Sequence, residues 1–93
     1  MRSQFSEPLI DAPIFLKLVF RMPIPKATTK AKMKAILNSE LFHVKRPDID
    51  NLAKAVLDAL NDTVIKDDSQ IYSLLADKVY SQSPGIYIEL VTE

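Results

Sequence analysis

The stretch from Lys45 to Gln70 constrains the fold of this chain more than any other, because it holds a strongly amphipathic run between two acidic pairs. Asp48 and Asp50 stand one residue apart directly before the run, and Asp67-Asp68 follows after it has ended. The sequence therefore predicts a helix that ends near Asn61-Asp62. Its apolar positions have the spacing of one helix face: Leu52, Ala55, Val56, Ala59 and Leu60.

The start of this helix admits two interpretations. Pro47 suits a helix start, and Asp48 or Asp50 can accept hydrogen bonds from the first free N–H groups. Aspartates in such places are most often caps, but one cap needs only one aspartate. Lys54 lies four residues after Asp50, so the two side chains project from neighbouring turns of one face. If the loop after the helix folds back, three carboxylates and this lysine meet in a candidate divalent-metal site.

The segment RPDIDNLAKAVLDAL followed by KDDSQI resembles the RusA family of Holliday junction resolvases of bacteria and their prophages. The family pattern is a basic residue and proline before D-x-D-N, then a helix with a lysine, then a D-D-x-Q turn. All of these stand here in order, and the resemblance runs from about Pro8 to the C-terminus. It implies a magnesium-dependent, dimeric endonuclease. Position by position, it implies metal-binding carboxylates at Asp48, Asp50 and Asp68, with Lys54 as an essential basic residue.

Composition limits the class of protein. With 93 residues, of which 47% are hydrophobic, residues 1–93 are predicted to form one globular domain. The absence of cysteine excludes disulfides, thiolate metal sites and thiol nucleophiles. A single glycine excludes P-loop and dinucleotide-binding folds. No run is long enough to span a membrane and no signal peptide is recognisable, so a cytoplasmic protein is expected, bacterial or phage-encoded by the resemblance.

The charges are unevenly distributed although the net charge is zero. Residues 17–54 contain nine Lys or Arg against three acids, a net +6, and residues 55–93 contain two against seven, a net −5. Residues 1–16 contribute −1. A basic segment beside an acidic cluster suits a phosphate backbone, but solvated helix faces produce the same asymmetry. The candidate DNA-binding residues are Lys26, Lys30, Lys32, Lys34, Lys45 and Arg46.

Three strands are predicted from alternating apolar side chains. Residues 14–22 and 86–92 alternate as strands with one buried face do, and residues 71–80 form a further strand. Pro23 and Pro25 end the first strand, because proline cannot donate to the ladder. The expected core-facing side chains are Ile14, Leu16, Leu18, Phe20 and Met22, then Tyr72, Leu74, Ala76 and Tyr80, then Ile86, Ile88 and Leu90.

A short helix and a tight turn complete the elements. Residues 27–39 predict a helix capped by Thr28 or Thr29. Residues 81–85 have the composition of a hairpin turn, with a proline and a glycine free to take positive φ. The order β-α-α-β-β predicts an α/β (α+β) fold of the RusA type, with a small antiparallel or mixed sheet and helices packed on a face.

The N-terminal residues 1–13, with two prolines, are expected to be loose or extended. RusA relatives carry an earlier strand and helix that nothing here corresponds to, so the chain is interpreted as a fragment, a late start site or a shortened homologue. Loss of that strand would expose a sheet edge, whose unpaired N–H and C=O groups attract another chain. A homodimer formed by strand pairing or exchange is therefore expected.

Each candidate site residue has a chemical role. One or two Mg²⁺ ions held by Asp48, Asp50 and Asp68 can serve phosphodiester hydrolysis, because Mg²⁺ prefers oxygen ligands and keeps several waters. Lys54 could orient the attacking water or stabilise charge developing on the phosphoryl group. His43 is expected to be merely solvated, since the chain has no second histidine or cysteine to form a catalytic pair.

The leading hypothesis is a Mg²⁺-dependent, structure-selective endonuclease that resolves four-way DNA junctions by paired symmetric nicks in recombination and repair. Two symmetric nicks need two sites related by a twofold axis, which again implies a homodimer. The alternative is a truncated, catalytically impaired DNA-binding or structural protein. A third and weaker possibility is a metal-dependent hydrolase of small phosphoesters.

Overall fold

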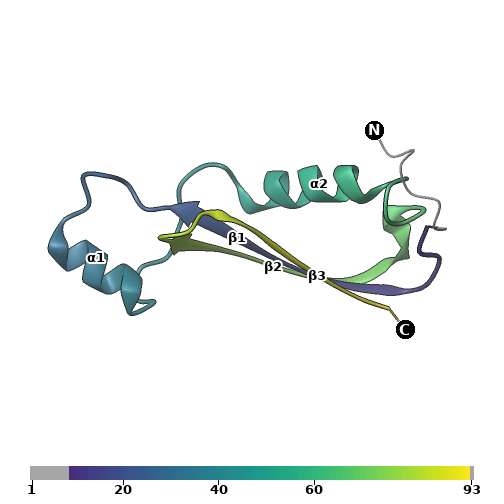
Figure 1. Ribbon diagram of the computed structural model, residues 1–93, viewed down its shortest axis with the longest axis horizontal. Coiled ribbons are helices and arrows are strands. Elements are labelled where there is room, and N and C mark those ends of the chain that lie inside the picture. The colour runs from purple at the N-terminus through teal and green to yellow at the C-terminus, as the bar shows by residue number, and fades with distance from the viewer. Residues whose placement is uncertain (1–8, 93) are drawn as a thin grey trace.

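The computed structural model describes residues 9–92. The strands and helices follow the predicted order of strand, helix, helix, strand, strand (Figure 1). They form an α+β fold around a mixed three-stranded sheet, which confirms the predicted fold class. The elements are β1 (Ile14–Pro23), α1 (Lys30–Leu37), α2 (Ile49–Leu60), the 3₁₀-helix η1 (Asp68–Gln70), β2 (Ile71–Ser81) and β3 (Gly85–Thr92).

β1 is the central strand, parallel to β2 and antiparallel to β3. Parallel neighbours need a crossover connection, and residues 24–70, which contain both helices, provide it. α2 therefore begins at the end of the sheet where β1 ends and runs back along the sheet toward the start of β1 (Figure 1). This direction decides which end of the domain each acidic pair occupies.

The predicted hairpin between β2 and β3 is wrong, because these strands lie on opposite sides of β1. Ser81 at the end of β2 pairs with Pro23, and Gly85 at the start of β3 pairs with Arg21. The turn between them therefore carries the chain past the end of β1, and Gly85 does not take a positive φ there. A hairpin would leave one edge of β1 unpaired, whereas the observed order pairs both edges of this most buried strand.

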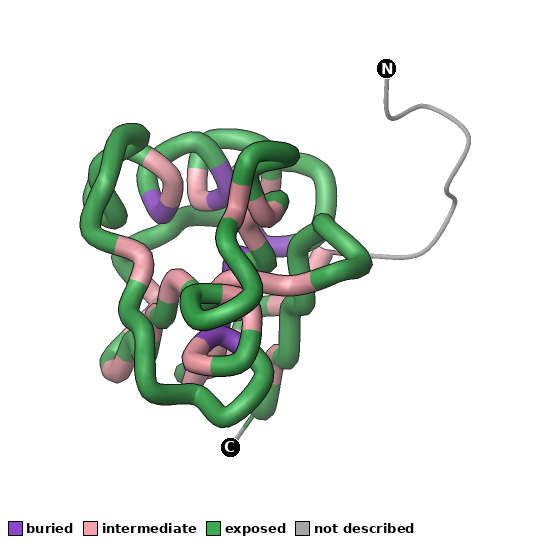
Figure 2. Tube along the Cα trace, turned by 90° about the vertical axis from the view of Figure 1, so that its left-hand side faces the viewer, coloured by how far each residue is buried: buried purple, intermediate pink, exposed green. Residues whose placement is uncertain are grey.

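The core lies between β1 and α2. The predicted inward face of β1 is confirmed, because Ile14, Leu16 and Leu18 are fully buried and Phe20 is 2% exposed. Buried residues elsewhere are few, and much of the chain is exposed (Figure 2). The other buried members of this core are Ala53 and Val56 of α2, and Ile65 in the following loop.

The helix face that packs on the sheet differs from the predicted stripe by a rotation. Leu52 and Leu60 of the predicted stripe pack against the core, but Ala55 and Ala59 are exposed. Ala53 and Leu57 pack in their place. The rotation thus buries one alanine and one leucine instead of two alanines, which removes more apolar surface from water.

The outer strands are less buried than predicted. Leu90 and Ala76 pack against the core, but Ile86 and Ile88 are 54% and 44% exposed. The physical reason is width, since one helix is about 10 Å across and three strands span roughly two spacings of 4.8 Å plus their edges. α2 alone therefore cannot cover the whole face. Other predicted core positions that remain exposed are Tyr72 and Leu74.

α1 stands beyond the end of the sheet and does not lie on its face (Figure 1). Its start is set by Thr29, whose side chain accepts a hydrogen bond from Lys32 N, as one of the two predicted caps. Ile36 is its buried residue. The chain then continues through a loop to α2, so this loop and both neighbouring helix ends lie at one end of the molecule.

The described part of the N-terminal segment is held by hydrogen bonds. Ile10 N donates to Val64 O, and Lys66 N donates to Ile10 O. Asp11 forms an ion pair with Lys66 at 3.0 Å. The segment is thus extended and attached, while residues 1–8 of the predicted loose region lie outside the described residues. Within residues 9–92 no helix is long and apolar enough to cross a membrane.

Candidate functional site

Asp48 and Asp50 stand at the start of α2 with exposed side chains. Asp48 occupies the N-cap position, but its side chain makes no capping hydrogen bond, and Asp50 lies in the first turn. Pro47 precedes the cap and is not the first helical residue. The capping interpretation therefore explains the position of Asp48 but not its carboxylate, which is not engaged by the helix it begins.

An open hollow adjoins the Asp48 carboxylate and is lined by Arg46, Pro47, Asp48 and Asn51. Lys54 follows Asp50 by one turn and is also exposed. The described residues show no ion pair between Asp50 and Lys54, so the lysine is not neutralised by its helical neighbour. Arg46 and Asp48 thus line the hollow, and Asp50 and Lys54 are exposed on the first turns of the helix that begins there.

Asp68 lies at the other end of α2. The helix has 12 residues, about 18 Å at 1.5 Å per residue, and Asp68 follows its C-terminal end in η1. Hydrogen bonds from Ile65 N to Leu60 O and from Gln70 to Ile10 hold this turn at that end. The expectation that the loop folds back to the start of α2 is wrong within one chain. Across residues 9–92 no three acidic or histidine side chains gather in a way that could hold a metal ion.

The two aspartates of the D-D-x-Q turn differ in their surroundings. The Asp67 carboxylate accepts a hydrogen bond from Ser69 N at 3.1 Å, and Asp67 N donates to Gln70 Oε1 at 2.9 Å, which together make a capping box. Hydrogen bonds from Ser69, first its side chain and then its backbone, lower the pKa of Asp67. Asp68 is exposed and has no part in this capping box. Asp67 is therefore the structural aspartate, and Asp68 remains available.

Gln70 fastens the same turn to the N-terminal segment. Its Nε2 donates to Ile10 O and to Ala12 O, both at 3.0 Å. With the bond from Asp67 N, the side chain makes three hydrogen bonds, two of which join it to residues 58 and 60 positions away in the sequence. The glutamine of the motif thus has an architectural role that spacing in the sequence does not reveal.

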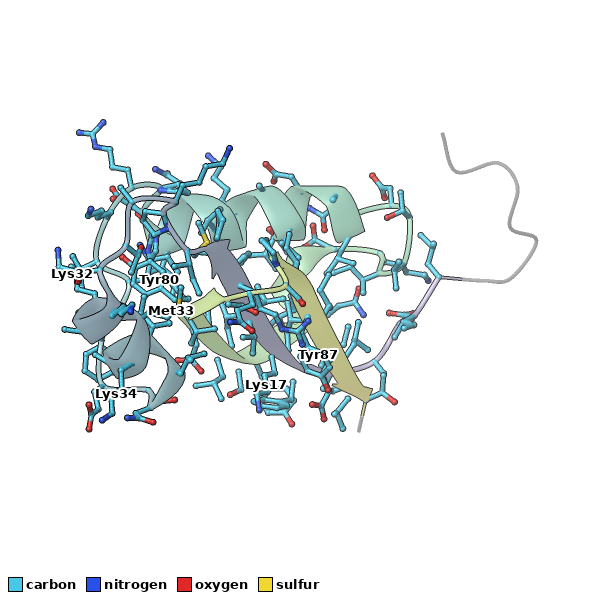
Figure 3. All side chains as sticks on the ribbon, turned by 60° about the vertical axis from the view of Figure 1, so that its left-hand side comes forward. Lys17, Lys32, Met33, Lys34, Tyr80 and Tyr87 are labelled. Atoms are coloured by element: carbon cyan, nitrogen blue, oxygen red, sulfur yellow. The ribbon has the colours of Figure 1, made fainter. Side chains whose placement is uncertain are left out.

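The predicted DNA-binding residues gather at the end of the molecule where α2 begins. Lys32 and Lys45 line one cavity of about 260 Å³ between α1, the following loop and Tyr80. Lys32 and Lys34 point to different sides of α1, so no single face of that helix carries all its lysines (Figure 3). All six candidate side chains are exposed, namely Lys26, Lys30, Lys32, Lys34, Lys45 and Arg46.

His43 is not simply solvated, because its ring lies edge-on to Tyr80 with centroids 5.0 Å apart. Its Nδ1 is buried with no hydrogen-bond partner among the described residues. Burial, followed by the charges of Lys78 and then Lys45, lowers the pKa of His43. The histidine therefore remains neutral near pH 7 and packs the loop against β2.

Lys78 is the residue at this site that the sequence patterns did not single out. Its Nζ donates to Lys45 O at 2.7 Å and to Pro47 O at 2.9 Å. The available signal was its position on the same strand phase as Ala76 and Tyr80, the predicted inward face. A lysine in that phase buries its stem and must find partners for its ammonium.

The fold and the site define a small α+β domain that presents two unengaged carboxylates at a helix start beside basic side chains. A model of the family Endodeoxyribonuclease RusA matches residues 1–91, and the chain belongs to this family. It is 34% identical over 84 residues to a Bacillus subtilis (strain 168) protein described as "Uncharacterized protein YqaN". That alignment covers 88% of this chain and 59% of the relative, so the chain spans about three fifths of the relative's length. No solved structure matches the chain.

Proposed function

We propose that this protein is a Mg²⁺-dependent, structure-selective DNA endonuclease that resolves four-way junctions by paired symmetric nicks, in recombination and repair. The observation that carries the proposal is the pair of exposed carboxylates of Asp48 and Asp50, unengaged at the start of α2, in a member of the RusA family. Mg²⁺ is commonly bound by one or two carboxylates, several waters and substrate phosphate oxygens, so the donor set fits this ion.

Asp48 and Asp50 would hold the ion, which supplies Lewis-acid stabilisation of charge on the phosphoryl oxygens when bound. Lys54, one turn along the helix, presents an ammonium that can stabilise negative charge developing on the phosphodiester. Arg46 lines the same hollow and can bind a phosphate with two parallel hydrogen bonds. The roles of Lys54 and Arg46 require that Asp48 and Asp50 remain exposed, because the ion and the phosphate must reach these carboxylates.

Asp68 would reach such a site from a second copy of the chain. Within one chain the length of α2, about 18 Å, separates it from Asp48 and Asp50. Two symmetric nicks already require a homodimer. A twofold axis can place η1 of each protomer beside the start of α2 of its partner. Among residues 9–92 β2 and β3 are the outer strands of the sheet, and outer strands can pair with another chain.

DNA would approach the end of the molecule that carries the basic residues. Lys45 and Arg46 directly precede the carboxylates in sequence, and Lys32 lines a cavity with Lys45. Phosphate contacts of this kind position a duplex without reading its sequence, which suits an enzyme selective for branch structure. The proposed DNA-binding set is that named from the sequence: Lys26, Lys30, Lys32, Lys34, Lys45 and Arg46.

A second candidate function is a DNA-binding or structural protein without turnover. The observation that favours it is that no three-carboxylate cluster exists within the described residues. The two candidates make opposite predictions for Mg²⁺. An enzyme should be stabilised by Mg²⁺ and should cleave a junction, whereas the non-catalytic protein should bind the junction equally well with Mg²⁺ or with EDTA present.

The test is cleavage of a synthetic four-way junction with millimolar Mg²⁺, alongside a thermal melt with and without the ion. Asp50→Asn should abolish cleavage and the Mg²⁺-dependent rise in Tm. The control is Asp58→Asn, an exposed aspartate two turns further along the same helix, which should change neither. Wild-type protein that shows no cleavage and no Mg²⁺ shift would overturn the enzyme proposal.

A mixing experiment tests whether the site is shared between protomers. Asp50→Asn and Asp68→Asn proteins should each be inactive alone. If Asp68 acts on the partner's site, a heterodimer of the two contains one site with both aspartates intact and should nick one strand. If both aspartates act within one chain, every site in the mixture lacks one of them and no nick should appear.

A further inference from the structure

Lys78 connects β2 to the loop that leads into α2. It lies opposite Phe20 on the helix-bearing face of the sheet. From there its ammonium reaches Lys45 O at 2.7 Å and Pro47 O at 2.9 Å, two carbonyls on either side of Arg46. Hydrogen bonds from a charged donor are shorter and stronger than neutral ones. One side chain therefore holds the backbone immediately before Asp48.

The loop has few other ties to the domain. In the part of the chain that the structure describes, residues 41–47 make no backbone–backbone hydrogen bond outside regular elements, and the next such bond is Leu52 N to Asp48 O at the start of α2. Phe42 and Val44 are 75% and 84% exposed, so packing fixes little of this loop. A further contact of this loop is the His43 ring, which lies edge-on to Tyr80.

We propose that Lys78 is a positioning residue, which fixes the Lys45–Pro47 backbone and thereby sets where the carboxylates of Asp48 and Asp50 stand relative to the sheet. The inference rests on the proposed function for what those carboxylates bind. Lys78 acts through the loop and is not assigned a contact with DNA or metal. Its charge also lowers the pKa of His43 after burial does, consistent with an ammonium seated close to this loop.

The first test needs no metal and no DNA. Lys78→Met keeps the apolar stem and removes the donors, and Lys17→Met is the matched control because it removes the same charge from the opposite face of the sheet (Figure 3). Trypsin should cleave after Lys45 at least tenfold faster in Lys78→Met, because the protease cuts the loop in its locally opened form, while cleavage after Lys66 stays unchanged. In Lys17→Met cleavage after Lys45 should match the wild type. A lost hydrogen bond of about 1.4 kcal/mol corresponds to this tenfold change.

The second test measures the site. The Mg²⁺ concentration for half-maximal junction cleavage should rise about tenfold in Lys78→Met, while the Kd for the junction in EDTA stays within twofold. A purely structural loss of stability would lower the active fraction without moving the Mg²⁺ midpoint. Lys78→Arg keeps a charged donor, so its Mg²⁺ midpoint should lie close to the wild-type value.

The outcomes separate the inference from the function. Equal rates of trypsin cleavage after Lys45 in Lys78→Met and Lys17→Met would overturn the inference whether or not the protein cleaves DNA. If this loop is cut faster in Lys78→Met but the wild type never cleaves the junction, Lys78 orders the loop and the proposed function fails instead. Should Lys78→Met not fold, a folded Lys78→Arg protein whose loop is cut at the wild-type rate supports the inference, and one whose loop is cut at least tenfold faster overturns it.

Discussion

Replacing Gln70 by Met tests whether the D-D-x-Q turn is held by this side chain. Methionine keeps the length and apolar stem but removes all three hydrogen bonds, two to Ile10 O and Ala12 O and one from Asp67 N. Each such bond contributes about 0.5–1.5 kcal/mol net. Because the bonds to Ile10 and Ala12 are only partly buried, water can replace some of this. We expect the free energy of unfolding to fall by about 2 kcal/mol.

The assay is urea unfolding followed by circular dichroism at fixed protein concentration, since association would otherwise shift the midpoint. The midpoint should fall while the m-value stays constant, because the same surface is exposed on unfolding. Gln82→Met, in the exposed turn between β2 and β3, is the matched control and should change stability by less than about 0.5 kcal/mol. If both glutamine variants unfold at the same urea concentration, the architectural role given to Gln70 is refuted.

Three further predictions concern the core, a carboxylate and Lys54, the lysine proposed to act in catalysis. Leu18→Ala removes a fully buried side chain at the centre of the sheet and should cost about 3–4 kcal/mol in urea unfolding; a loss under 1 kcal/mol would contradict the placement of the core. Asp67 has a lowered pKa in the folded protein, so its contribution is complete above its unfolded pKa of about 3.9 and is lost as pH falls further. The difference in unfolding free energy between wild type and Asp67→Asn should therefore be constant near pH 7 and should become smaller below about pH 4. If this difference is unchanged at pH 3, the Asp67 carboxylate does not stabilise the fold through its charge. Lys54→Ala should keep the Mg²⁺-dependent rise in Tm yet lose junction cleavage, and retention of full cleavage would remove Lys54 from the site.

The local elements could be predicted from the sequence because their signals lie within a few residues. Alternation over Ile14–Pro23 identified β1 and its buried face, and Thr29 marked the start of α1. The amphipathic run identified α2 to within a residue at its C-terminal end, where Asn61 is the cap. The acidic motif placed the chain in its family, which the family comparison confirms.

The neighbours of each strand were decided by the tertiary structure. Turn residues at 81–85 favour a hairpin locally, yet β2 and β3 separate because β1 gains a hydrogen-bonded neighbour on both edges. The rotation of α2 that buries Leu57 and exposes Ala55 likewise depends on the sheet beneath it, which no helical period specifies.

The site shows the same division between local and long-range information. The exposed pair Asp48 and Asp50 follows from the sequence, because a helix start fixes both within one turn. The position of Asp68 does not follow from the sequence. In the crossover between β1 and β2, α2 runs along the sheet, and Asp68 comes after its C-terminal end, far from Asp48 and Asp50. The hydrogen bonds from Lys78 to the loop join residues more than thirty apart in sequence, and only the register of β2 against β1 brings them together.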